Sequence, residues 1–418
     1  MTAFDNATFD TLISASPTGH TDARKAAFEV FDTTEMPTEA LEDWRYVNLD
    51  LDLDDLTPAT EAGEPISDGR FMSTLGDRPR ITIIDGIVTA IDDTDVEVHR
   101  LAELDTLPMR AAEPERNKLS AAAAAFGTDG VWVRVPDNHV SETPLIVDMQ
   151  STQTGVISFP RLVVELGSNS EAAVILVHRG ETSTHTVPDV FLDVGDGARL
   201  RFLEVQGFGA ESVGVVHQRV RIGRDGNVRL GEVGLGGRIG RLDITIEMEG
   251  NGSSSEVIGV FFGERDQTMD YRMVMNHIGR NTSSDVFLKG AVEDEAQSVF
   301  TGLLRIEEDA AGTSAFETNR NLVLSDGAKA HSVPNLEILN NDVICGHGSS
   351  VGPLEEANLY YLMSRGLSRE RAERLLMKGF FREAMDRLPI TEFNDLVEGI
   401  FTERFIRASQ ESAATTSS

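Results

Sequence analysis

Cys345, the single cysteine of the chain, stands two residues before His347 in the segment Asp342–Gly348. In a β-strand, residues two apart point to the same side, so the thiol and the imidazole would project together. Gly346 and Gly348 carry no side chains, so a metal, a cluster or another backbone could come close. A thiolate with an imidazole is a plausible pair of ligands for a soft metal.

Two ligands do not complete a tetrahedral site, so the remaining ligands would have to come from another chain. With one thiol, the chain has neither an internal disulfide nor an all-cysteine metal site of its own. The alternative is structural, a buried cysteine beside a hydrogen-bonded histidine, because free cysteines are among the most buried residues. Both interpretations stay open at this point. Two further histidines, His277 and His331, lie in later strand-like segments and could approach Cys345.

Composition excludes several other functions. Lys and Arg number 37 against 69 Asp and Glu, so the formal net charge of −32 disfavours nucleic acid and anionic membrane surfaces as partners. The Gly-rich run at 231–237 is not followed by Gly-Lys-Ser/Thr, so it predicts no phosphate-binding loop.

The N-terminus lacks the pattern of a signal peptide, and no stretch approaches the roughly 18 apolar residues of a membrane helix. We therefore expect a cytoplasmic protein.

The elements that position Cys345 belong to a repeat. Glycines that open polar turns recur every 28 residues, at Gly167, Gly195 and Gly223. Apolar residues flank each glycine at the same alternating positions, which predicts strands that bury one face. A fourth unit ends at Met248 with its alternation shifted by one residue, as a one-residue difference in turn length would produce.

Two architectures accommodate this repeat, a sandwich of hairpins and a parallel β-helix in which each repeat is one coil. The nearly constant interval favours the β-helix, because each coil must stack its inward residues on those of the preceding coil. No helical pattern long enough for βαβ crossovers lies between the strands, which argues against a doubly wound sheet.

Helices are predicted before this repeat. Residues 1–70 form a helical region, with an amphipathic helix over Asp22–Phe31 and a polar, Pro- and Gly-rich linker over 57–70. The β-helix core is expected over 71–352. Within it, five consecutive alanines predict a short helix at Lys118–Phe126.

Helices are also predicted after the repeat, in residues 353–418. Pro353 suits a first helical turn and Gly366 a C-terminal stop, which brackets a helix over 354–365. Residues 409–418 look like a disordered tail.

Two more helices are predicted in this region, capped by Ser368 and Thr391. The apolar stripe of the first comprises Ala372, Leu375, Leu376, Gly379 and Phe380, and that of the second comprises Phe393, Leu396, Val397, Ile400 and Phe401.

These segments resemble the SufB/SufD family of iron–sulfur cluster assembly proteins, most strongly over about residues 270–385. The Cys-x-His-Gly form of Cys345–Gly348, in place of the His-Glu-Ala of SufB, and the run Trp44–Tyr46 resemble the SufD branch. The matching runs are Ser332–Ile338, Asp342–Gly352 and Leu359–Gly366, together with the upstream stretches His277–Gly290, Phe300–Gly302 and Thr318–Arg320.

The resemblance implies a right-handed parallel β-helix with helical ends, in a complex with a SufB-like subunit and two copies of a SufC-like ABC ATPase. Cys345 and His347 become candidate ligands of a transient iron–sulfur cluster at the SufB interface, and sulfur delivery falls to the partner. The C-terminal helices would dock the ATPase. Candidate partner-binding residues there are Tyr361, Arg365, Gly366, Leu375, Leu376, Gly379 and Phe380.

The expected role is a non-catalytic scaffold that builds and transfers nascent clusters while its partners supply ATPase and desulfurase activity. A flavin in the assembled complex and a homodimer of the isolated chain are compatible with the resemblance. The alternative is a β-helix carbohydrate-active enzyme, which would predict secretion and acid–base residues along the groove.

Overall fold

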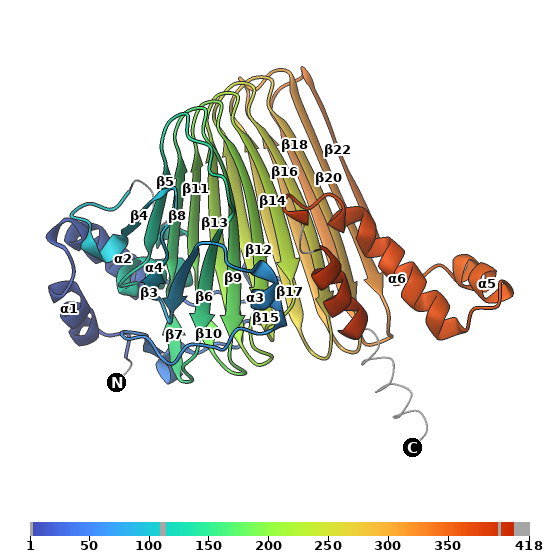
Figure 1. Cartoon of the computed structure of the whole chain (residues 1–418), viewed down its shortest axis with the longest axis horizontal. Helices are drawn as coiled ribbons and strands as arrows, with labels where there is room; N and C mark the ends of the chain where they lie inside the picture. Colours follow the sequence, from blue (N-terminus) through green and yellow to red (C-terminus); the bar gives the residue numbers. More distant parts are fainter. Residues whose placement is uncertain (1–2, 109–113, 392–393, 405–418) are drawn as a thin grey trace.

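The computed structural model describes residues 3–108, 114–391 and 394–404. Its centre is a parallel β-helix of about eight turns, built from two long sheets (Figure 1). Each coil contributes one strand to each sheet, and the strands of successive coils pair in parallel. The β-helix prediction is therefore confirmed and the sandwich of hairpins is wrong, because hairpins pair antiparallel strands.

We call the two sheets sheet A and sheet B. Sheet A contains β4 (Glu97–Arg100), β5 (Val131–Val135), β8 (Arg161–Leu166), β11 (Asp189–Val194), β13 (Val213–Ile222), β15 (Ile239–Met248), β17 (Thr268–His277), β19 (Gln297–Ile306) and β21 (Lys329–Ile338), with the short strands β1 (Thr57–Pro58), β7 (Val156–Ser158) and β10 (His185–Thr186) off this path. Sheet B contains β3 (Ile87–Ile91), β2 (Arg80–Ile84), β6 (Leu145–Ser151), β9 (Glu171–Gly180), β12 (Arg199–Gly207), β14 (Asn227–Gly234), β16 (Ser254–Gly263), β18 (Ser283–Val292), β20 (Thr313–Val323) and β22 (Val343–Gly352).

The 28-residue interval sets the register of the coils. Leu166, Val194 and Ile222, each one residue before its glycine, are in-register partners across β8, β11 and β13. The positions seven residues after the glycines are likewise in register across β9, β12 and β14. Residues of one row therefore stack inside the β-helix, as the repeat predicted.

The shifted fourth unit has a longer turn. Four residues connect β13 to β14, whereas five residues, 249–253, connect β15 to β16. The extra residue lies in the turn, so Ile222 still pairs with Met248 and the inward rows continue. The predicted one-residue difference is confirmed.

Helices cover the outer faces of both sheets. α1 (Asn6–Ser14), α2 (Thr21–Thr33) and α4 (Lys118–Phe126) share an apolar cluster with the outer face of sheet A. On sheet B, α3 (Arg70–Leu75) and the C-terminal helices form the corresponding cluster. The inward side chains of both sheets form a separate apolar core.

The N-terminal helix predictions are confirmed. The predicted helix at 22–31 lies within α2, and α4 has the predicted bounds. Asn117 caps α4 by accepting the N–H of Ser120 at 3.0 Å. The short 3-10 helices are η1 (Thr18–His20), η2 (Glu42–Trp44), η3 (Leu53–Asp55), η4 (Leu101–Glu103) and η5 (Pro114–Arg116).

Residues 57–70, predicted as a linker, are hydrogen bonded to the β-helix. They begin with β1, which pairs with β7. Farther along, the N–H of Gly63 donates to Asp85 at 3.0 Å and that of Ile66 to Gln150 at 2.7 Å. Polar residues here satisfy buried backbone and side-chain groups, which composition alone does not distinguish from solvation.

The first C-terminal helix, α5 (Glu356–Ser364), begins two residues later than predicted. Glu355 is its extended N-cap, so Pro353 lies outside the helix and its predicted first-turn position is wrong. Gly366 has a φ of +93°, which confirms the predicted stop.

The second helix, α6 (Arg369–Met385), is capped by Ser368 as predicted. Residues 394–404 are also helical, in agreement with the third prediction. Phe393 and the predicted tail, 409–418, lie outside the described residues.

Candidate functional site

The last coil, formed by β21 and β22, leaves one end of the β-helix open (Figure 1). Within the described ranges, one edge of each of these strands has no neighbouring strand. Leu304 and Ile306 are fully buried inside the preceding coil, whereas their partners Leu336 and Ile338 are 37% and 42% exposed. An unpaired edge with exposed apolar side chains is suited to pairing with another chain. We call β21 and β22 the open end.

Cys345 and His347 lie in β22 and face the interior. Cys345 is in register with Ala315 and His347 with Glu317, and both partners are buried inside the coil before. The two side chains therefore share one face of the strand, as predicted. Cys345 is half-buried and packs against the core, and His347 is exposed. Because no described coil covers β22, both residues are accessible from the open end.

Glu317 is a site residue that the sequence analysis missed. It is 2% exposed, and among the described residues neither oxygen of its carboxylate has a hydrogen-bond partner. Burial raises the pKa of Glu317 to about 8. A sequence signal was present, since Glu317 interrupts an inward row that is otherwise apolar up to that point, through Leu230, Val257 and Val286.

The other two histidines do not join this group, so the expectation that they approach Cys345 is wrong. His277 lies two coils earlier, where its ring nitrogens are 2.8 Å from Thr282 Oγ1 and 2.9 Å from Ser284 Oγ. Burial lowers the pKa of His277 to about 4. His331 points outward from sheet A and stacks on Tyr46.

In the part of the chain that the structure describes, no three His, Cys, Asp or Glu side chains are arranged to hold a metal ion. Cys345 and His347 therefore supply an incomplete ligand set. A thiol and an imidazole on one face can bind iron only together with groups from outside this set.

A local pattern in β22 has the spacing of a serine nucleophile elbow, Gly348-Ser349-Ser350-Val351-Gly352, and the sequence analysis missed it. Such an elbow requires a sharp strand-to-helix turn that exposes the serine. Here Ser350 lies within the continuous strand β22, in register with Arg320. The pattern therefore does not build a nucleophile elbow.

The C-terminal helix α6 packs through a different face from the predicted one. The predicted stripe residue Leu375 is 50% exposed, Gly379 is exposed, and Leu376 and Phe380 are half-buried. Of the predicted residues, only Ala372 is fully buried. The side chains that contact sheet B and helix 394–404 are instead Met377, Phe381, Ala384 and Met385.

Polar contacts fasten α6 to sheet B. The ammonium group of Lys289, whose side chain is 3% exposed, donates to the carbonyl of Phe380 at 2.7 Å and pairs with Glu383 at 2.5 Å. Arg387, just after α6, pairs with Glu256 at 2.9 Å and with Asp285. These contacts connect the helix to two neighbouring strands of the sheet, β16 and β18.

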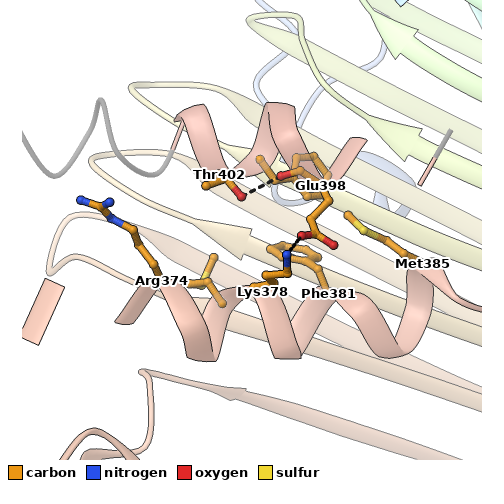
Figure 2. A pocket seen from close by; sticks show the side chains of 8 residues that line it. Arg374, Lys378, Phe381, Met385, Glu398 and Thr402 are labelled. Atoms are coloured by element: carbon orange, nitrogen blue, oxygen red, sulfur yellow. Dashed lines mark hydrogen bonds and ion pairs between the residues drawn. The ribbon is translucent and has the colours of Figure 1, made fainter. Parts of the chain in front are cut away.

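The space between α6 and helix 394–404 is too small for a ligand. Its volume is about 20 Å³, which is room for one water molecule. Figure 2 shows the carboxylate of Glu398 directed at the ammonium group of Lys378 across this space, with Phe381 and Met385 beside them. The two helices form one packed unit.

The helices α5 and α6 carry several exposed apolar side chains. Tyr360, Tyr361, Met363 and Leu375 are 75%, 56%, 40% and 50% exposed, and we call them the C-terminal surface. The guanidinium of Arg365 lies 5.2 Å from the ring centre of Tyr361. In Figure 1, α5, which carries Tyr360, Tyr361 and Met363, extends away from the β-helix. An exposed apolar group of this kind is typical of protein interaction sites.

Comparisons with known proteins agree with this geometry. Residues 148–380 match the family model described as the SufBD core domain of the SUF iron–sulfur cluster assembly system. An iron–sulfur cluster assembly SufBD family protein of Mycobacterium leprae is 31% identical over 304 residues, which cover 70% of this chain and 77% of the relative. The iron–sulfur cluster assembly protein SufD of Bacillus subtilis is 30% identical over 284 residues, 66% of this chain and 64% of the relative. No helix among the described residues has the length and apolarity to cross a membrane.

Proposed function

The chain belongs to the SufBD family of iron–sulfur cluster assembly proteins, and we propose that it is a SufD-type scaffold subunit that pairs with a SufB-like subunit. The observation that carries this proposal is the open end, where Cys345 and His347 share the inner face of β22, a strand with one unpaired edge among the described residues. Family membership favours this role over the carbohydrate-active alternative. A single thiol suits the reducing cytoplasm, where we place this activity.

A SufB-like β-helix would continue the stack at the open end. Its last coil would pair with the free edges of β21 and β22 and cover Leu336 and Ile338. The same contact would bring its side chains over Cys345 and His347, and these groups would complete the ligand set for iron and sulfide. Since the free edges also suit a second copy of this chain, a homodimer in the absence of SufB follows from the same surface.

A SufC-like ATPase would bind the C-terminal surface. Lys289 and Arg387 hold α6 on sheet B, so a force applied to the helical pair is transmitted to the strands of the β-helix. Closure of two ATPase subunits on ATP binding would then move this chain relative to its SufB-like partner and open the shared interface. Opening would expose Cys345 as thiolate and His347 as imidazole to incoming iron.

The test is to co-express the chain with SufB-like and SufC-like subunits, purify the complex anaerobically and measure its iron and sulfide. The double variant Cys345→Ala and His347→Ala should assemble normally, and its complex should retain several-fold less iron and sulfide. His99→Ala, an exposed histidine in the first strand of sheet A, is the matched control and should retain the wild-type content. Full iron and sulfide content in the double variant would disprove the site.

A further inference from the structure

Glu317 is an exception within its own strand. The other inward polar residues of β20 have partners: Asn319 donates to Ser332 Oγ at 2.9 Å, and Asn321 donates to Asn319 Oδ1 at 3.1 Å. Thr313 likewise donates to the carbonyl of Ala310 at 2.8 Å. Glu317, which is 2% exposed, has no partner for either carboxylate oxygen in the part of the chain that the structure describes. A buried carboxyl group without partners lowers stability in either protonation state, which points to a functional role for Glu317.

No described group donates a hydrogen bond to the Glu317 carboxylate. A Cβ atom placed on Gly302 would lie 2.1 Å from the carboxylate, so the carboxylate occupies the space that this glycine leaves free. The residue stacked on Gly302 in the last coil is Pro334, which has no N–H. Burial is the single cause of the raised pKa of Glu317, with no contribution from a charged neighbour.

His347 is the residue stacked on Glu317 toward the open end. Neighbouring strands are about 4.8 Å apart, so an exposed imidazole can reach the carboxylate by rotating about its own side-chain bonds. Histidines that bind a metal through one ring nitrogen usually donate the N–H of the other to a carboxylate, which fixes the tautomer and the ring orientation.

We propose that Glu317 is a positioning residue for His347. The carboxylate of Glu317 accepts the second imidazole N–H when His347 binds iron at the open end. This inference rests on the function proposed above for His347. It assigns Glu317 a hydrogen bond that forms only in the loaded complex, in keeping with a carboxylate that has no partner within the described ranges.

The test is the affinity of the anaerobic complex for ferrous iron, measured by competition with a chelator. Glu317→Met should weaken binding about 10- to 100-fold, the usual effect of losing such a partner. Glu317→Gln keeps an acceptor oxygen and should lose less. In a His347→Ala background, Glu317→Met should cause no further loss, because the residue acts through the imidazole.

Glu232→Met is the matched control. Glu232 is also an inward carboxylate, 1% exposed and with no described hydrogen-bond partner for either oxygen, but it lies three coils from Glu317 in sheet B. Both methionine variants should raise the urea midpoint of the isolated chain, and only Glu317→Met should weaken iron binding.

Wild-type iron affinity in Glu317→Met would overturn the inference. The inference would also fail if Glu317→Met weakened iron binding in the His347→Ala background as much as it does in the wild-type background. If His347→Ala itself binds iron normally, the function proposed for the site fails too. Weaker iron binding in Glu317→Met, together with wild-type iron binding in Glu232→Met, would support the inference.

Discussion

The ring of Tyr46 is stacked on the imidazole of His331, with ring centres 4.4 Å apart and planes inclined by 12°. This contact ends a series along the outer face of sheet A. Trp44 lies 3.8 Å from the guanidinium of Arg241 in β15, Asp43 pairs with Arg272 in β17 at 2.9 Å, and the carbonyl of Tyr46 accepts from Gln297 in β19. Residues 43–46 therefore contact four successive strands of sheet A, and the last of these, β21, belongs to the open end.

Replacing Trp44, Arg45 and Tyr46 singly by alanine should produce graded losses of stability. Trp44→Ala should cost about 3–5 kcal/mol because the ring is fully buried, and Tyr46→Ala about 1 kcal/mol because the stack is half-buried. Arg45→Ala, at an exposed position, is the control and should change the free energy of unfolding by less than about 0.5 kcal/mol. Urea unfolding measures all three. Equal losses of unfolding free energy in Trp44→Ala and Arg45→Ala would show that the contacts of Trp44 do not stabilise the chain.

Removing the anchor of α6 should loosen the helix while the β-helix stays intact. Lys289→Met leaves the carbonyl of Phe380 and the carboxylate of Glu383 without their donor, at a cost of about 1–3 kcal/mol. Glu383→Gln should cost less, because the Glu383 side chain is 53% exposed. Amide hydrogen exchange should become faster in α6 and remain slow in β18. Unchanged exchange in α6 would argue against this anchor.

The C-terminal surface should be separable from the packed face of α6. Leu375→Asp should leave the free energy of unfolding nearly unchanged and abolish co-purification with the SufC-like ATPase, because Leu375 is exposed. Phe381→Ala should instead destabilise the chain by about 3–5 kcal/mol, since Phe381 is 2% exposed. An ATPase that binds Leu375→Asp normally would show that docking uses another surface.

Stability should decrease in acid partly because of His277. Its pKa is about 4 in the fold, below the ordinary value of 6.5, so the folded state favours the neutral ring. As the pH falls below about 6.5, the unfolded chain binds a proton that the folded chain does not bind until about pH 4. The expected loss is about 1.4 kcal/mol per pH unit in this window, or about 2 kcal/mol at pH 5.

His277→Gln removes this titration, so the difference in unfolding free energy between pH 7.5 and pH 5 should shrink by about that amount. His99→Gln, with an exposed imidazole, is the control and should keep the wild-type difference. A His277→Gln variant with the full acid sensitivity would assign the loss to other groups.

Much of the architecture follows from the sequence by itself. Strand side chains alternate and coils must stack in register, so the repeat around the glycines at 167, 195 and 223 favoured the β-helix whose register the structure has. The same alternation placed Cys345 and His347 on one face. Caps such as Ser368 were predictable because they satisfy local backbone groups.

Other features depend on contacts between segments far apart in the chain. α6 has apolar residues on more than one face, and contact with sheet B selected Met377 and Phe381 over Leu375. Glu317 lacks a hydrogen-bond donor among the described residues partly because Gly302 and Pro334, on the opposite sheet, have no donor side chain. Local periodicity specifies which side chains share a face, but only the packed structure decides what each face meets, because burial and pairing are properties of neighbours in space.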